Sequence, residues 1–204
     1  MKTSTLIALS SLFAASSGVH AEENADDRGL STLPSGTYVM DKTHGYVTFS
    51  YSHMGFSNPV LRFDDVDAEV SLVADKLSGS TLKVLIDPAS INTAVPKFDD
   101  HLKGKDFFDV TIHKEVTFTS TSISFETPYS GTLTGDLTVK GITKPVTLDV
   151  TLNKAAPHPF KGVPAFGITA TGQVDRQDFD LSAYVPNVGA VVDLRIEAEF
   201  AKSE

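Results

Sequence analysis

The chain has 204 residues, of which 26 are Asp or Glu and 17 are Lys or Arg, and its formal net charge at neutral pH is −9. This acidity argues against a nucleic-acid-binding protein, because no basic patch is available to neutralise phosphates, and no polybasic stretch is present that would bind an anionic membrane surface. Cysteine is absent, which excludes disulfides, thiol catalysis and cysteine-based metal sites. The length suits one domain that buries a substantial core.

The first 21 residues have the pattern of a secretory signal peptide. Lys2 supplies a positive start, an apolar run follows over residues 6–15, and Val19-His20-Ala21 is a cleavage site of the small-x-small type. The apolar run is too short to span a bilayer. We therefore expect residues 1–21 to be removed, residues 22–35 to form a flexible leader, and the mature protein to lie in the periplasm or outside the cell.

Alternation of apolar and polar residues is the strongest structural signal in the chain. It is clearest over residues 135–152, where two alternating runs flank a polar turn that contains Gly141 and Pro145, as in a β-hairpin. Similar alternation recurs along most of residues 36–204, which predicts one closed or nearly closed antiparallel barrel. We predict strands over residues 37–41, 46–53, 61–73, 80–86, 116–125, 130–139, 146–153, 167–174 and 191–200.

One segment breaks this alternation and has the spacing of a helix. Phe98 and Leu102 lie four residues apart, Pro96 stands where a helix often begins, and Gly104 can end it. Asp99 would favour the positive N-terminal end of the helix. We predict one short amphipathic helix here, beside the barrel.

The interior of such a barrel is the first candidate for a functional site. A barrel of about eight strands has room for its own side chains or for one ligand. The many phenylalanines on the predicted strands, with few converging polar groups, indicate an apolar lumen that suits a lipid. A different hypothesis is a ligand-free module, in which these Phe side chains fill the barrel.

An enzyme is the alternative to a binding protein. Its best candidate base is His101 with Asp100 or Asp106, but the histidines are scattered and form no pair with metal-ligand spacing. No nucleophile elbow or phosphate-binding glycine loop is present. Asp64, Asp65 and Asp67 lack the spacing of a calcium loop. We therefore expect no catalytic residue, no metal and no cofactor.

Several short motifs in order resemble one known family. They are Asp41-Lys-Thr-His44, Val47-x-Phe49, His53-Met-Gly55, Arg62-Phe-Asp-Asp65, Asp99-Asp-His-Leu102, Asp106-Phe-Phe-Asp109, Gly135-Asp-Leu-Thr138, Gly141-Ile-Thr-Lys-Pro-Val-Thr-Leu148, Asp175-Arg-Gln-Asp-Phe179 and Ile196-Glu-Ala-Glu199. In this order they are similar to the motifs of the YceI-like family, over roughly residues 36–202. The resemblance implies a periplasmic or secreted, lipocalin-like antiparallel barrel that binds polyisoprenoids, isoprenoid quinones or related long-chain lipids.

The sequence departs from the family pattern at two positions that are often cationic. Ser52 replaces a frequent Arg, and Phe98 stands where a basic residue is common. Their loss favours a lipid with an uncharged head group, such as a quinone or an amide, over a pyrophosphate.

We therefore predict a non-enzymatic carrier that holds one long-chain isoprenoid or related lipid, without stable insertion into a membrane. The oligomeric state stays open, a homodimer included. The expected ligand-binding residues are large apolar side chains from the strands and from the helix, which would act as a lid. They are Phe49, Tyr51, Phe63, Leu85, Phe98, Leu102, Phe108, Phe118, Leu133, Leu148, Ile168 and Phe179.

Overall fold

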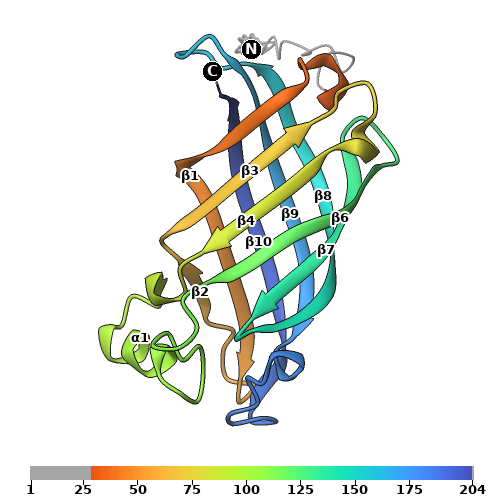
Figure 1. The fold of residues 1–204 in the computed structure, drawn as a ribbon. Coiled ribbons are helices and arrows are strands. Elements are labelled where there is room, and N and C mark those ends of the chain that lie inside the picture. Colours follow the sequence, from red (N-terminus) through yellow and green to blue (C-terminus); the bar gives the residue numbers. More distant parts are fainter. Residues whose placement is uncertain (1–28, 204) are drawn as a thin grey trace, which may run out of the picture.

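The computed structural model describes residues 29–203, so the predicted signal peptide and most of the predicted leader lie outside the described residues. The described chain is mainly β-structure (Figure 1). Its strands are β1 (Gly36–His53), β2 (Val60–Phe63), β3 (Val66–Leu72), β4 (Thr81–Ile86), β5 (Ile91–Asn92), β6 (Val116–Phe125), β7 (Ser130–Val139), β8 (Ile142–Pro157), β9 (Pro164–Asp175) and β10 (Val188–Lys202).

Eight of these strands close into an antiparallel barrel. Each strand pairs with its neighbour in the order β10-β9-β8-β7-β6-β4-β3-β1, and an additional pairing of β10 with β1 closes the ring. The seam between β1 and β10 runs from Tyr38 opposite Lys202 to His53 opposite Val188. The short strands β2 and β5 extend the sheet beside the second half of β1. The predicted all-β, lipocalin-like barrel with one short α-helix is confirmed.

The strand boundaries differ from the prediction where the alternation changes phase. The predicted strand over residues 61–73 is two strands, because Asp64 and Asp65 stand between Phe63 and Val66, which are both buried. In a regular strand one residue separates two inward-facing residues, whereas here two residues do. The inward-facing positions therefore change from odd to even numbers at this point. Conversely, the two predicted strands over residues 37–41 and 46–53 are one long strand, β1, with a bulge between Met40 and Gly45.

The helix α1 (Pro96–Lys103) begins and ends where the sequence indicates. Pro96 occupies its first turn, and the backbone N–H of the C-cap Gly104 donates to the His101 carbonyl. Asp99 accepts hydrogen bonds from the backbone N–H and the hydroxyl of Thr93, both at 2.7 Å, which ties the helix to the preceding loop. The helix lies beside β2 and β5 at one end of the barrel, which we call the helix end (Figure 1). Within residues 29–203 no helix is both long and apolar enough to cross a membrane.

Halfway along the barrel, two large side chains lie over two glycines. A Cβ atom on Gly135 would stand 2.3 Å from the Phe118 ring, and one on Gly172 would stand 2.6 Å from a methyl group of Leu148. Phe118 and Leu148 are both buried, each with 8% of its surface exposed. Only glycine leaves room for them, so the middle of the lumen is filled by the protein itself. We call this layer, formed by Phe118 and Leu148 over Gly135 and Gly172, the belt.

Candidate ligand-binding site

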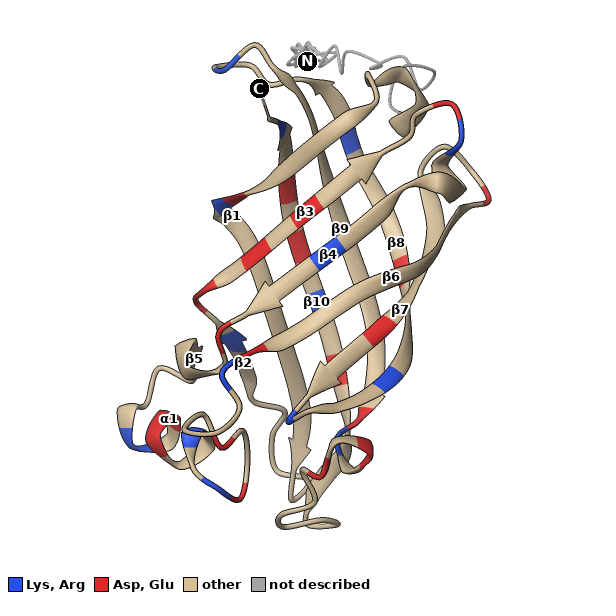
Figure 2. Ribbon diagram, in the orientation of Figure 1, with Lys and Arg blue, Asp and Glu red and all other residues tan. Residues whose placement is uncertain are grey.

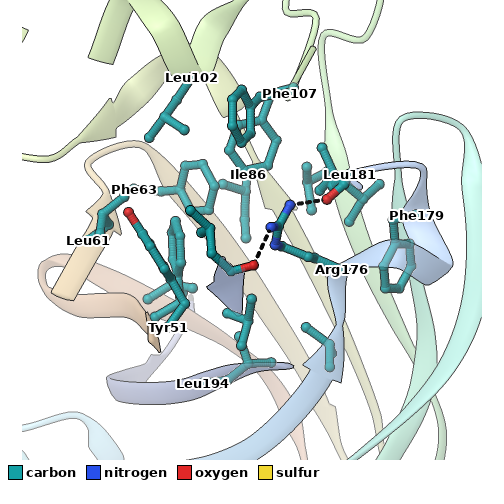
Figure 3. Close-up of a pocket in the computed structure, with 18 of the residues that line it drawn as sticks. Tyr51, Leu61, Phe63, Ile86, Leu102, Phe107, Arg176, Phe179, Leu181 and Leu194 are labelled. Carbon is teal, nitrogen blue, oxygen red and sulfur yellow. Dashed lines mark hydrogen bonds between the residues drawn. The ribbon is translucent and has the colours of Figure 1, made fainter. Parts of the chain in front are cut away.

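A cavity of about 370 Å³ lies in the lumen on the helix-end side of the belt. This volume falls within the range of known ligand pockets. Most of its wall is formed by apolar side chains from β1, β2, β4, β6, β7, β9 and β10, and the rest by Met54, by α1 and its following loop, and by residues 176–184. Figure 3 shows how Leu61, Phe63, Phe107 and Leu194 converge from these different elements.

The structure brings most of the expected ligand-binding residues to this cavity. Seven of them line it: Phe49, Tyr51, Phe63, Phe98, Leu102, Phe108 and Phe179. Leu133 and Ile168 line a second cavity of about 60 Å³ on the other side of the belt. Phe118 and Leu148 form the belt and line neither cavity. These eleven expected residues are therefore distributed along the length of the lumen.

The expectation for Leu85 is wrong. Its side chain is 40% exposed and lies on the outer face of the barrel. Strand β4 has apolar residues on both faces, and its inward positions are Leu82, Val84 and Ile86. Because successive strand residues point to opposite faces, an error of one position moves a side chain out of the lumen.

The most polar group in the cavity wall is Arg176, which the sequence did not single out as a ligand-binding residue. It stands in the short helical turn η5 (Arg176–Phe179) and is 7% exposed. Its Nε donates to the Gly189 carbonyl at 2.8 Å, its Nη2 to the carbonyls of Ala183 and Val188 at 2.9 Å each, and its Nη1 to the carbonyl of Leu181. Two of these bonds are drawn in Figure 3. Arg176 therefore holds the loop that follows it against the barrel.

No carboxylate pairs with Arg176 in the described part of the chain. Burial lowers the pKa of its guanidinium, against the smaller opposing effects of Asp175 and Tyr51. Burial raises the pKa of the nearby Tyr51 phenol, and the charge of Arg176 opposes this. Both groups keep their usual neutral-pH forms, a cation and a neutral phenol. The cavity thus has one buried cation on its wall, and apart from Tyr51, His53 and His101 the other side chains that line it are apolar.

His101 lies in an aromatic cluster at the edge of this cavity. The centre of its ring is 5.1 Å from that of Phe107, 6.1 Å from that of Tyr184 and 6.4 Å from that of Phe98. Within residues 29–203, no hydrogen bond or ion pair joins His101 to Asp100 or Asp106. The arrangement therefore joins α1 to the loop that contains Tyr184, and it does not form an acid–base pair.

The acidic residues Asp64, Asp65 and Asp67, at the start of β3, form surface ion pairs. Lys42 Nζ lies 3.1 Å from Asp65 and 2.8 Å from Asp67, and Arg62 pairs with Asp64 at 2.6 Å. Within the described residues, no group of three or more His, Asp or Glu side chains is arranged to hold a metal ion.

Comparison with known sequences identifies the family. The model of the YceI-like domain matches residues 38–200, which is nearly all of the described chain. The chain belongs to the YceI-like family. "Protein YceI" of Shigella flexneri is 31% identical over 188 residues, which cover 92% of this chain and 91% of that protein. A "UPF0312 protein" of Pseudomonas savastanoi pv. phaseolicola is 34% identical over 164 residues, which cover 79% of this chain and 84% of that protein.

Solved structures share the barrel of this YceI-like chain. BcnA of Burkholderia cenocepacia superimposes with a TM-score of 0.71 at 21% identity, over 78% of this chain and 98% of that one. A polyisoprenoid binding domain from Saccharophagus degradans superimposes with a TM-score of 0.61 at 13% identity, over 81% of this chain and 98% of that one. At these identities the likeness concerns the fold.

Proposed function

We propose that this YceI-like protein is a periplasmic carrier that holds one long-chain isoprenoid lipid, with the tail in the helix-end cavity. The observation that carries the proposal is the apolar lining of that cavity inside a closed barrel. Burial gives about 0.8 kcal/mol per CH₂ group, so a chain of about twenty carbons gains roughly 15 kcal/mol before the cost of ordering it. The tail alone therefore provides enough binding energy. A neighbour in fold, the Saccharophagus degradans domain, is described as binding polyisoprenoids.

Arg176 supports an uncharged head group that accepts a hydrogen bond. A guanidinium has five N–H groups, and four of those of Arg176 are engaged by backbone carbonyls. One N–H on Nη1 remains for a ligand, while the four carbonyls already stabilise the positive charge. A quinone carbonyl or an amide oxygen fits this single donor, whereas a pyrophosphate would need several cationic partners. Ser52 and Phe98, at positions where the family often has basic residues, supply none.

Native mass spectrometry of the protein isolated from the periplasm of its own host tests the proposal. We expect a mature chain that starts at Glu22 and carries one bound lipid, whose fragments identify an isoprenoid tail with a neutral, oxygen-containing head. A chain that retains residues 1–21 would contradict the periplasmic location. A ligand-free protein that also fails to bind added ubiquinone would contradict the carrier function and favour the ligand-free barrel. Lipid turnover that is lost in His101→Ala would indicate an enzyme.

A further inference from the structure

Two neighbouring loops at the helix end expose large apolar side chains. The first, residues 54–60, runs from the end of β1 to the first residue of β2, and the second, residues 182–188, ends at the first residue of β10. We call them the mouth loops. Their exposed fractions are 55% for Met54, 89% for Phe56, 67% for Val60 and 59% for Tyr184. The backbone N–H of Met54 donates to the carbonyl of Asn187 at 2.8 Å, so the two loops form one surface.

This surface surrounds the entrance of the cavity. Met54 and Tyr184 both line the helix-end cavity, and more than half of each side chain is exposed to solvent. The cavity therefore reaches the outside between them. Tyr184 also packs against Phe107 and His101, with ring centres 6.2 and 6.1 Å apart, so the mouth loops are connected to the segment around α1.

The mouth loops carry no charge. Residues 45–61 and residues 181–192 contain no Asp, Glu, Lys or Arg, although charged residues make up 21% of the chain. Figure 2 shows the resulting absence of blue and red at the lowest loop of the barrel. At the opposite end Phe160 is also exposed, at 93%, but there the next residue, Lys161, forms an ion pair with Asp41 at 2.9 Å. Exposed apolar residues within an uncharged stretch of sequence are thus a feature of the mouth loops, whereas the charges at this end lie on α1 and its following loop (Figure 2).

We infer that the mouth loops dock onto the surface of a lipid bilayer, so that the ligand passes between membrane and cavity without crossing water. This inference rests on the proposed lipid-carrier function. Charged groups resist transfer out of water, whereas exposed Phe, Met and Val gain by it, so an uncharged apolar surface fits the boundary between head groups and acyl chains. The lack of a cationic patch matches a neutral bilayer. A long isoprenoid also has its reservoir in membranes, because each CH₂ group disfavours the passage through water.

The absence of tryptophan from the chain permits a direct test. Phe56→Trp places a single reporter on the mouth, and Phe160→Trp places one at the opposite end as a matched control. With phosphatidylcholine vesicles, we expect the fluorescence of the Phe56→Trp protein to shift to the blue and to be quenched by lipids brominated near the head group. The control should show neither effect. Unchanged fluorescence of the Phe56→Trp protein, or equal shifts at both positions, would overturn the inference.

A second comparison separates docking from lipid binding. Phe56 does not line the cavity, so Phe56→Ser should bind ubiquinone in detergent solution like the unmodified protein, with vesicle partitioning reduced roughly tenfold. Transfer of ubiquinone between vesicles should slow, and Phe160→Ser should change neither quantity. Normal binding with unaffected transfer would overturn docking alone, whereas failure of the unmodified protein to bind would overturn the carrier function. A blue shift that grows with protein concentration in the absence of vesicles would assign the surface to a second copy and overturn the membrane inference.

Discussion

At the scale of single residues, Phe118 sets how far a ligand can enter. Its ring lies over Gly135 in the belt, with the 370 Å³ cavity on one side and the 60 Å³ cavity on the other. Phe118→Ala removes the ring from the belt, so we expect the two cavities to join and the preferred chain length to increase. The substitution should also cost about 3 kcal/mol of unfolding free energy, because it leaves a void. Competition between isoprenoid quinones of increasing length measures the preference.

Leu152→Ala is the matched control for Phe118→Ala. Leu152 is buried, with 3% of its surface exposed, but it lines neither cavity and does not belong to the belt. Leu152→Ala should lower the unfolding free energy by a few kcal/mol and leave the preferred length of the lipid chain unchanged. An equal shift of chain length in both variants would mean that general loosening, and not the belt, controls the length.

Arg176 is the residue on which the loop before β10 depends. Arg176→Met removes the donors for the carbonyls of Leu181, Ala183, Val188 and Gly189, and we expect it to lower the unfolding free energy by about 3 kcal/mol. Amide hydrogen exchange over residues 181–189 should accelerate more than exchange elsewhere in the barrel. Arg176→Lys keeps the charge, but a lysine cannot donate to all four carbonyls. Its unfolding free energy should therefore lie between those of the unmodified protein and of Arg176→Met. Uniform exchange rates in the Met variant would contradict the holding role.

At the scale of elements, α1 is the segment we expect to close over the ligand. Phe98 lies on the side of α1 that faces the cavity and is half-buried, while the adjacent Lys97 is exposed to solvent. Phe98→Asp places an unpaired charge against the apolar tail, so we expect ubiquinone to dissociate at least about tenfold faster with the β-sheet circular dichroism preserved. Lys97→Asp makes a similar change on the solvent side and should leave dissociation as it was. An unchanged rate for Phe98→Asp would show that α1 is not a lid.

The strands and the helix could be predicted from the sequence because each has its own periodicity. In β7 and β8, apolar residues at every second position mark one inward face, and in α1 the spacing of Phe98 and Leu102 marks another. The inward face of β4 could not be predicted, because Leu82, Val84, Leu85 and Ile86 are apolar on both faces and only pairing with β3 and β6 decides between them. The break before β3 was missed for a related reason, since an extra residue shifts the alternation without ending it.

At the scale of the whole molecule, the apolar lumen was easier to predict than its division by the belt into two cavities. Alternation indicates which side chains point inward, but it does not show how far along the barrel each one lies. The belt depends on Phe118 and Leu148 meeting Gly135 and Gly172 from other strands, a match that exists only once the strands are in register. Arg176 was missed because a charged residue is seldom buried without a carboxylate. Its place in the motif Asp175-Arg-Gln-Asp-Phe179 was the available signal.

The seam between β1 and β10 has a consequence for how the protein is made. The barrel closes by joining its first strand to its last, with Tyr38 opposite Lys202, across nearly the whole length of the chain (Figure 1). A chain emerging from the ribosome cannot make this pairing until the residues of β10 have been synthesised. Contacts of such long sequence separation also form slowly. The nascent polypeptide therefore keeps the edge of β1 unpaired with β10, and the barrel open, until β10 has been synthesised.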